Sequence, residues 1–277
     1  MARPIFQHLL LATERTEFDA GAERLALALA RRNDQTLGIV MPLAFNAEFE
    51  AVAPALAERA DREAAAKLDR LRAQAREAGV EIDLAVRHGD EPCAEIVDDA
   101  RERGADLIVI RRRGRRSFLA QLMVGEMVGK VVANAPCSVL IVPRDAALWQ
   151  RRVLVAFEPD AQGQRLAALA TALAAEAGIP LTAVCVLSSG MPRSVAEAQL
   201  GDLKRAAAGA GVQADTEVLE GAPAERILDA ARRTGADLIV MGVRGLAHAG
   251  RAKVGRVAHE VAGRFDGALV LASSAPR

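Results

Sequence analysis

The chain contains two copies of one sequence segment, and this repeat constrains its fold more than any other feature. Pro92–Gly114 reads PCAEIVDDARERGADLIVIRRRG, and Pro223–Gly245 reads PAERILDAARRTGADLIVMGVRG. Aligned without a gap at an offset of 131 residues, the two segments agree at about half of their positions, including the whole block GADLIV. A repeat at this spacing is typical of a duplicated domain and is too long for a solenoid unit. We therefore predict two domains of one type, at residues 1–145 and 150–277.

The amino-acid composition argues against two classes of binding partner, nucleic acids and membranes. The 277 residues include 36 Lys and Arg and 36 Asp and Glu, so the net charge gives no general attraction to nucleic acid or to an anionic membrane. With one Trp and no Tyr, the chain lacks aromatic platforms for stacking bases. No apolar run approaches the ~20 residues that cross a bilayer. We expect neither nucleic acid nor membrane as a partner.

The cysteines and the N-terminus favour a cytoplasmic protein. Cys93, Cys137 and Cys185 are odd in number and scattered, and they form neither a disulfide framework nor a zinc-binding spacing. The short apolar run near the N-terminus is followed at once by charged residues, which is not typical of a signal peptide. We expect a cytoplasmic location and no metal site.

Short apolar runs alternate with longer amphipathic segments in both halves. We expect strands over residues 8–13, 36–43, 80–86, 106–110 and 138–142, and again over 152–157, 181–187, 212–218, 237–241 and 268–272. Helical patterns separate them, over residues 19–32, 54–78, 91–103 and 124–134, and over 164–177, 195–208, 223–234 and 253–263. Continuously apolar strands that alternate with helices indicate parallel sheets covered on both faces. The expected fold is α/β, with two tandem open five-stranded parallel sheets.

Three features together resemble the universal stress protein family. They are an acidic residue after the first strand of each half (Glu14 and Glu158), the block GADLIV, and a glycine-spaced loop after the fourth strand. The resemblance covers nearly the whole chain, once per half. It implies a Rossmann-like sheet of the nucleotide-binding alpha-hydrolase type, with nucleotide at the carboxyl edge where strand order reverses. It also implies a role in stress response, and two halves that pack together as single-domain members do in their dimers.

The second half keeps the glycine spacing that the resemblance associates with nucleotide binding, G-x2-G-x9-G-(S/T). Gly242, Gly245 and Gly255 are in register, although Arg256 replaces the closing Ser or Thr. Glycines let backbone N–H groups approach phosphate oxygens, and the N-terminus of the following helix attracts the anion. Together with Glu158, which stands where the family usually has Asp, these four residues form the predicted nucleotide site, with ATP and Mg as candidate ligands.

Arg256 has two interpretations. Its guanidinium could fork onto phosphate oxygens and strengthen binding. Alternatively, it could fill the site itself by pairing with Glu158 or Glu260. A third interpretation assigns Gly242 and Gly245 to nothing more than a turn after a strand.

The first half preserves the pattern less well. Arg111 replaces the first glycine, Gly114 and Gly125 are separated by ten residues, and Glu126 closes the loop. A carboxylate near a phosphate costs roughly 1 kcal/mol in water-like surroundings, and about 4 kcal/mol at a surface-like dielectric, for unit charges ~4 Å apart. We therefore do not expect an ordinary ATP site in the first half.

The arginine-rich run from Arg111 to Arg116 is the densest charge feature. One interpretation is an anion site for a phosphorylated small ligand, a coenzyme A-like tail or, as the least favoured choice, the backbone of a nucleic acid. Its candidate residues are Arg111, Arg112, Arg113, Gly114 and Gly125. The other interpretation is a solvated loop whose arginines pair with the acidic helix over residues 91–102.

Taken with these observations, the resemblance implies a cytoplasmic stress-response regulator with residual or lost nucleotide binding, in which the second half is the better binder. A structural or interaction module, with both sites filled by the protein's own side chains, is the alternative. A slow ATPase in the second half is a further alternative, but no known catalytic motif is present and His248 has no ligand partner at suitable spacing. We assign no catalytic residue. A homodimer and unidentified protein partners are left open.

Overall fold

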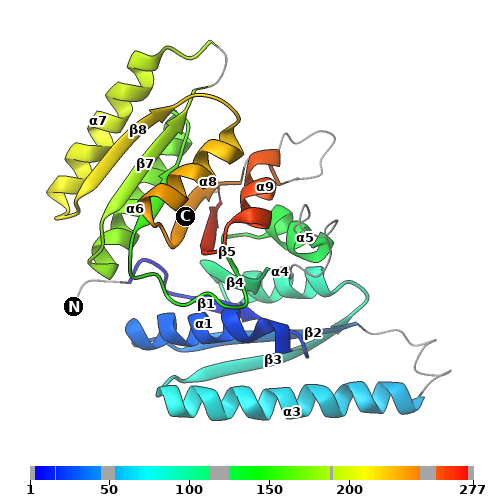
Figure 1. Ribbon diagram of the computed structural model, residues 1–277. Coiled ribbons are helices and arrows are strands. Elements are labelled where there is room, and N and C mark those ends of the chain that lie inside the picture. Colours follow the sequence, from blue (N-terminus) through cyan, green and yellow to red (C-terminus); the bar gives the residue numbers. More distant parts are fainter. Residues whose placement is uncertain are drawn as a thin grey trace.

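The computed structural model describes residues 4–15, 17–44, 54–112, 125–187, 190–243 and 254–273. Each half contributes five strands (Figure 1). Those of the first half are β1 (Leu9–Ala12), β2 (Leu37–Ala44), β3 (Ile82–Gly89), β4 (Leu107–Arg111) and β5 (Ser138–Val142). Those of the second half are β6 (Val153–Ala156), β7 (Leu181–Val186), β8 (Ala214–Leu219), β9 (Leu238–Gly242) and β10 (Ala268–Ala272).

Helices lie between the strands in the expected order. The first half has α1 (Ala20–Arg32), α3 (Pro54–Ala78), α4 (Pro92–Glu102) and α5 (Glu126–Asn134), with the short 3₁₀ helix η1 (Glu17–Asp19) before α1. The second half has α6 (Ala161–Ala177), α7 (Arg193–Gly209), α8 (Pro223–Thr234) and α9 (Arg256–Arg264). The alternation that the hydrophobic pattern predicts is confirmed.

The ten strands form one continuous sheet in the order β3-β2-β1-β4-β5-β10-β9-β6-β7-β8. Pairing is parallel within each half. At the centre β5 and β10 pair antiparallel, with Leu140 opposite Val270. The predicted α/β fold with two parallel five-stranded units is confirmed, and the structure adds that the units join edge to edge. This join leaves β3 and β8 as the edges of the sheet, at opposite ends of the molecule (Figure 1).

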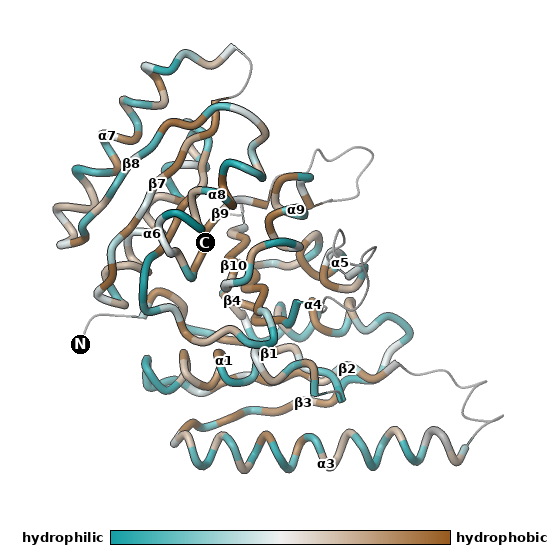
Figure 2. The backbone as a smooth tube through the Cα atoms, in the orientation of Figure 1, coloured by the Kyte–Doolittle hydropathy of each residue, from teal (hydrophilic) through white to brown (hydrophobic). Residues whose placement is uncertain are grey.

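Of the helices that the structure describes, four cover each face of this sheet. One hydrophobic core contains buried residues of α1, α3, α6 and α7, and the other contains buried residues of α4, α5, α8 and α9. The tube coloured by hydropathy shows apolar residues concentrated along the strands, whereas the helices are mixed (Figure 2). Strands buried on both faces explain the continuous apolar runs of the sequence.

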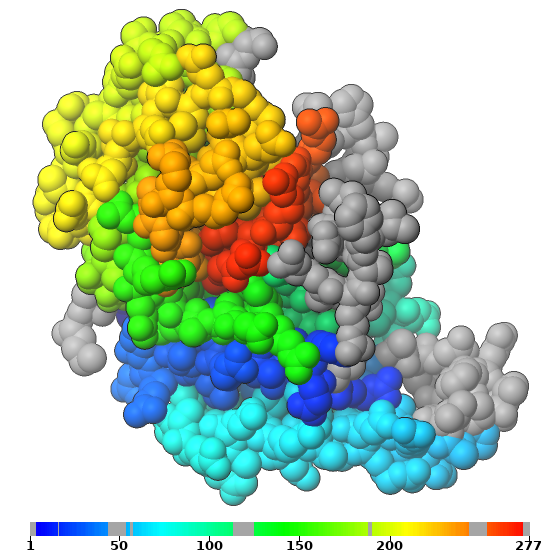
Figure 3. Space-filling view, in the orientation of Figure 1, coloured from blue at the N-terminus to red at the C-terminus, as the bar shows by residue number. Residues whose placement is uncertain are grey.

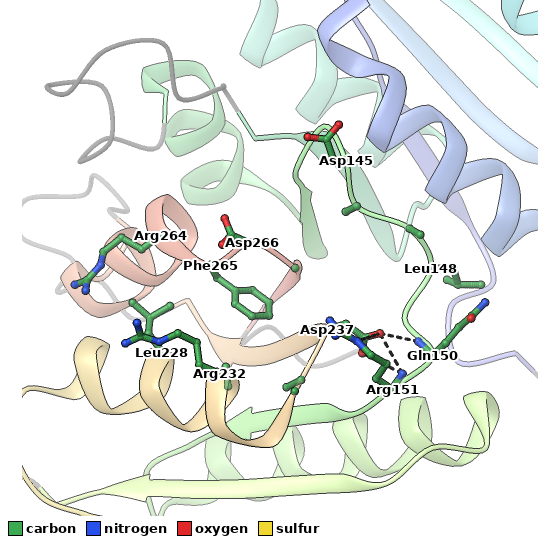
Figure 4. A pocket seen from close by; sticks show the side chains of 16 residues that line it. Asp145, Leu148, Gln150, Arg151, Leu228, Arg232, Asp237, Arg264, Phe265 and Asp266 are labelled. Atoms are coloured by element: carbon green, nitrogen blue, oxygen red, sulfur yellow. Dashed lines mark hydrogen bonds and ion pairs between the residues drawn. The ribbon is translucent and has the colours of Figure 1, made fainter.

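The aspartate of each GADLIV block holds the chain that enters the first strand of its half. Asp106 accepts hydrogen bonds from the backbone N–H groups of Gln7 and His8, at 2.7 and 3.1 Å. Asp237 does the same for Gln150 and Arg151, at 2.9 and 3.1 Å (Figure 4). The repeated block therefore has the same structural task in both halves.

The two halves are in broad contact (Figure 3). Trp149, from the segment that joins them, is 1% exposed, and the Arg32 guanidinium of α1 lies 5.5 Å from the centre of its ring. Arg32 also pairs with Glu176 of α6. Gly21 in α1 packs so closely on the carbonyl oxygen of Pro143 that an added Cβ would overlap it. Within the described part of the chain, no helix has the length and apolar character needed to cross a membrane.

Candidate functional site

A cavity of about 220 Å³ lies at the carboxyl edge of the sheet in the second half. Ala156 and Gly242 line it from the ends of β6 and β9, and Pro223 and Arg256 line it from the first residues of α8 and α9. The strand order reverses between β6 and β9, because the chain runs from β6 to β7 on one side and continues in β9 on the other. Open α/β sheets usually bind ligands at such a point.

Three of the five residues predicted for the nucleotide site line this cavity: Glu158, Gly242 and Arg256. Gly255 comes directly before α9 and caps it, with φ −60° and ψ 146°. Gly245 lies outside the described residues. The structure thus brings together the strand-end acid, the first glycine and the closing position, which are up to 98 residues apart in sequence (158 to 256).

Gly242 leaves little room for a side chain. A Cβ added there would lie 3.1 Å from Nε2 of Gln162 and 3.5 Å from Cδ1 of Leu166. Leu166 itself lines the cavity. The absence of a side chain at Gly242 therefore keeps this wall of the cavity free, as expected where backbone must approach a ligand.

Sequence reasoning missed Gly163, which also lines the cavity. An added Cβ at this position would overlap the carbonyl oxygen of Glu158, and it would lie 2.9 Å from the ring of Phe157. The N–H of Gly163 donates to the Asp160 carboxylate at 2.7 Å, which caps α6. This tight turn holds Glu158 beside the cavity. An Asp followed three residues later by Gly at a helix start is the sequence signal that could have identified it.

Arg256 is the first residue of α9 and is exposed. The first turn of α9 has no acidic residue, although a helix N-terminus carries positive partial charge. Glu260, one predicted partner of Arg256, pairs instead with Arg264 at 2.7 Å. Within the described ranges, the Arg256 guanidinium forms no ion pair. These contacts do not support the interpretation in which Arg256 pairs with Glu260 to fill the site.

Arg111 takes the place of Gly242 in the first half. Each is the last residue of its strand, β4 or β9. The Arg111 side chain is 9% exposed, with Nη2 2.5 Å from Oε2 of Glu14 and Nε 2.6 Å from Oδ1 of Asp19. An arginine of the protein itself therefore occupies the space beside the strand-end acid.

These residues belong to a larger group of buried charges, which extends to the neighbouring helices. Glu23 of α1 pairs with Lys67 of α3 at 2.7 Å, and both side chains are at most 4% exposed. The Thr13 hydroxyl lies 2.8 Å from Oε1 of Glu23 and 3.2 Å from Oδ2 of Asp19. We call the five charged residues the charge cluster: Glu14, Asp19, Glu23, Lys67 and Arg111.

The charge cluster has three carboxylates and two cations. Burial raises the pKa of Asp19 from 3.8 to about 6, although the Glu14 N–H and the Arg111 guanidinium act in the opposite direction. The nearby carboxylates of Glu14 and Glu23 raise this pKa further. A proton on Asp19 would make the cluster neutral, and the raised pKa indicates that it binds this proton readily.

The second half keeps the strand-end acid as Glu158, but it has Gly242 in place of Arg111 and an apolar residue in place of Thr13. By register with the paired strand, Phe157 follows β6 as Thr13 follows β1. Phe157 is 7% exposed and apolar, and it lines the cavity. The same fold therefore surrounds a charged network in one half and a cavity in the other.

The described residues that were predicted to bind an anion in the first half make separate contacts. Arg112 donates to the carbonyl oxygen of Phe265 after α9, and it lies 3.9 Å from Asp266. Among the acidic residues beside these two arginines, Glu14 and Asp19 at Arg111 and Asp266 at Arg112 lie outside the helix over residues 91–102, which was the expected partner of the run. Gly125 caps α5 with φ −52° and ψ 143°. Arg113 and Gly114 lie outside the described residues.

Other candidate groups do not gather at this site. Cys93 and Cys185 are buried, and burial raises the pKa of both thiols. His248 lies outside the described residues. Over the parts of the chain that the structure describes, no three or more His, Cys, Asp and Glu side chains form a group that could hold a metal ion.

A larger cavity, of about 660 Å³, lies at the opposite, amino edge of the second half (Figure 4). None of its described lining residues is a predicted site residue. Its three arginines each have an acidic partner: Arg151 pairs with Asp237, Arg232 with Asp229, and Arg264 with Glu260. We therefore take the smaller cavity as the candidate site.

Comparison with known proteins relates both halves of the chain to one family. The model of the universal stress protein family matches residues 5–143 and, a second time, residues 150–271. The universal stress protein YxiE of Bacillus subtilis (strain 168) is 41% identical over 75 residues, which are 27% of this chain and 49% of that protein. The match thus spans about half the length of this curated relative.

Solved structures resemble the whole chain. A universal stress protein from Archaeoglobus fulgidus DSM 4304 has a TM-score of 0.80 at 18% identity, and 96% of each chain is covered. A protein of unknown function from Pseudomonas aeruginosa PAO1 has a TM-score of 0.72 at 18% identity, over 97% of this chain and 93% of that one. At this identity the likeness concerns the fold alone.

Proposed function

This chain belongs to the universal stress protein family, and we propose that it is a stress-response protein whose second half binds an adenine nucleotide while its first half does not. One observation carries the proposal. At equivalent strand ends, Gly242 borders a cavity and Arg111 is buried against two carboxylates.

The second half offers a group for each part of a nucleotide. Apolar side chains of the cavity wall, among them Val184 and Ile227, suit a base. The Glu158 carboxylate suits a ribose hydroxyl, as acidic residues do in related sheets. The N-terminus of α9, with Arg256 as its first residue, suits phosphate.

The first half has the opposite properties. A nucleotide there would have to displace Arg111 and bring its phosphates toward the carboxylates of Glu14 and Asp19. Removing one partner from a buried ion pair typically costs about 3–5 kcal/mol, because the other charge is left uncompensated. We propose that the first half serves structure and packing. For this half, the proposal agrees with the alternative of an interaction module whose site is filled by the protein's own side chains.

The proposal concerns binding, and it assigns no residue to turnover. The cytoplasmic location and a homodimer stay predictions.

A thermal-shift titration with ATP, AMP and inorganic phosphate tests the second-half site. Saturation at about a hundred times Kd stabilises the native state by about 2.7 kcal/mol, which raises Tm by a few degrees. We expect this rise with nucleotide in the wild type and none in Gly242→Arg, which introduces the first-half residue. Gly209→Arg is the matched control, because a side chain at Gly209 has open space. A nucleotide-induced rise in Gly242→Arg equal to that of the wild type would refute the assignment.

A further inference from the structure

The sequence segment from Gly242 to Arg256 begins and ends at the candidate site, and it is rich in cations. From Gly242 to Arg256 there is no Asp or Glu, and there are four basic residues: Arg244, Arg251, Lys253 and Arg256. Arg256 falls within the described residues, where it is exposed and lines the cavity. A phosphate bound at the N-terminus of α9 therefore meets the positive charge of Arg256.

These residues do not fit a magnesium ion. Mg²⁺ prefers an octahedron of oxygen ligands, and proteins usually provide one or two carboxylates beside the substrate phosphates. Among the described residues that line the cavity, Glu158 is the one carboxylate, and it shares the cavity with the Arg256 guanidinium. A cationic side chain at this place repels a divalent cation and attracts the same phosphate oxygens.

The N-terminus of α9 also carries more positive charge than its counterpart in the first half. The first residue of α5 is Glu126, an acid that compensates the helix dipole and pairs with Lys130 at 3.4 Å. The first residue of α9 is Arg256, and its first turn has no acid. A guanidinium can form two parallel hydrogen bonds to phosphate oxygens, which gives it the neutralising role that Mg²⁺ has elsewhere.

We propose that the second-half site takes the free nucleotide anion and not its magnesium complex, and that Arg256 determines this preference. The inference rests on the proposed nucleotide binding and names the charge state of the ligand. Mg²⁺ bound to the phosphates reduces their charge and competes with Arg256 for the same oxygens, so it weakens binding.

Isothermal titration of ATP, at constant ionic strength, tests this inference. We expect wild-type protein to bind ATP about tenfold more tightly in EDTA than in excess Mg²⁺, the size of one hydrogen bond to a charged group. In Arg256→Ser, affinity in EDTA falls about tenfold and the difference between the two buffers disappears. Arg256→Lys keeps the charge without the planar fork, and an intermediate preference is expected. Arg264→Ser, at the other end of α9, is the matched control and keeps the wild-type preference.

The outcomes separate this inference from the proposal on which it rests. Binding that is equal or tighter in Mg²⁺ overturns the inference and leaves nucleotide binding intact. A preference for free ATP that persists in Arg256→Ser also overturns it, because another group would then be responsible. Absence of ATP binding in both buffers overturns the inference and the proposed function together.

Discussion

Arg111 and Gly242 occupy the same place in two copies of one fold, and their surroundings differ only in part. In both halves the fourth strand pairs with the first in the same register, with Leu9 opposite Leu107 and Val153 opposite Leu238. The glycines that cap α5 and α9 have nearly the same backbone angles. The comparison shows that this backbone is compatible either with a buried charged side chain at the end of the fourth strand or with a cavity, depending on the residue there and on its neighbours.

The charge cluster holds Arg111 in its buried position in the first half. Arg111 and Lys67 are the two cations among three carboxylates, and four of the five side chains are at most 9% exposed. Glu14 is the partial exception, at 24%. Stability in the first half should therefore depend on these residues, whereas the equivalent positions of the second half should affect ligand binding.

The largest expected effect is on stability, and it comes from replacing Arg111 of the first half with glycine, the residue at the equivalent position of the second half. Arg111→Gly leaves Glu14 and Asp19 without their guanidinium, and we expect the free energy of unfolding to fall by about 3–5 kcal/mol. Chemical denaturation measures this loss. Arg59→Gly is a comparison at an exposed ion pair with Glu63, where the loss of the pair itself contributes no more than about 1 kcal/mol. Equal losses in the two variants would show that Arg111 is not held by a buried network.

The next effect is the pH dependence that Asp19 gives to the first half. Its pKa is higher in the folded protein, about 6, than its ordinary value of 3.8. The folded state therefore binds the proton of Asp19 more tightly than the unfolded state does. The stabilisation that this proton gives to the folded state is fully present below about pH 4, and it is lost as the pH rises through 6. The full loss is up to about 3 kcal/mol, from about two pKa units at 1.36 kcal/mol each.

Denaturation of wild type and Asp19→Asn at a series of pH values isolates this contribution. Other groups titrate in both proteins and cancel in the difference. The stability of the wild type relative to the variant should fall between about pH 4 and 7. A difference that is constant, or that rises over this interval, would contradict the raised pKa.

The smallest effect concerns the helix that follows each loop. Arg256→Glu gives α9 the residue type that begins α5, and an acid at a helix N-terminus stabilises by about 0.3–1 kcal/mol. We expect unliganded Arg256→Glu to be slightly more stable than the wild type and to lose nucleotide affinity. Thermal denaturation with and without AMP measures both. A variant that is less stable than the wild type, or that keeps its nucleotide affinity, would contradict the proposed difference between the N-termini of α5 and α9.

The sequence was sufficient to predict the fold where the signal is local and periodic. The helix Pro54–Ala78 and the strand Ser138–Val142 have the bounds that their patterns predict. The third strand begins and ends later than expected, at Ile82–Gly89, because it includes the polar residues Arg87 and His88. Those residues pair with β2 at the edge of the sheet, where the apolar pattern is weak.

The sites were harder to predict because they depend on long-range contacts. The sequence shows that Arg111 replaces a glycine, but nothing in it indicates that Glu14, 97 residues earlier, would hold the guanidinium. The pairing of β5 with β10 is likewise a tertiary event between two similar apolar strands. In the second half the positions Glu158, Gly242 and Arg256 were found because the repeat and the family pattern mark them. Gly163 follows neither pattern and was missed.

The number of nucleotides bound per chain tests the central claim most directly. Isothermal titration of wild-type protein with AMP in EDTA gives this number together with the affinity. The account predicts one nucleotide per chain, because the cavity beside Gly242 is available and the corresponding space in the first half is occupied by Arg111. Two nucleotides per chain would show that the charge cluster does not exclude a ligand, and none would show that the second half does not bind one.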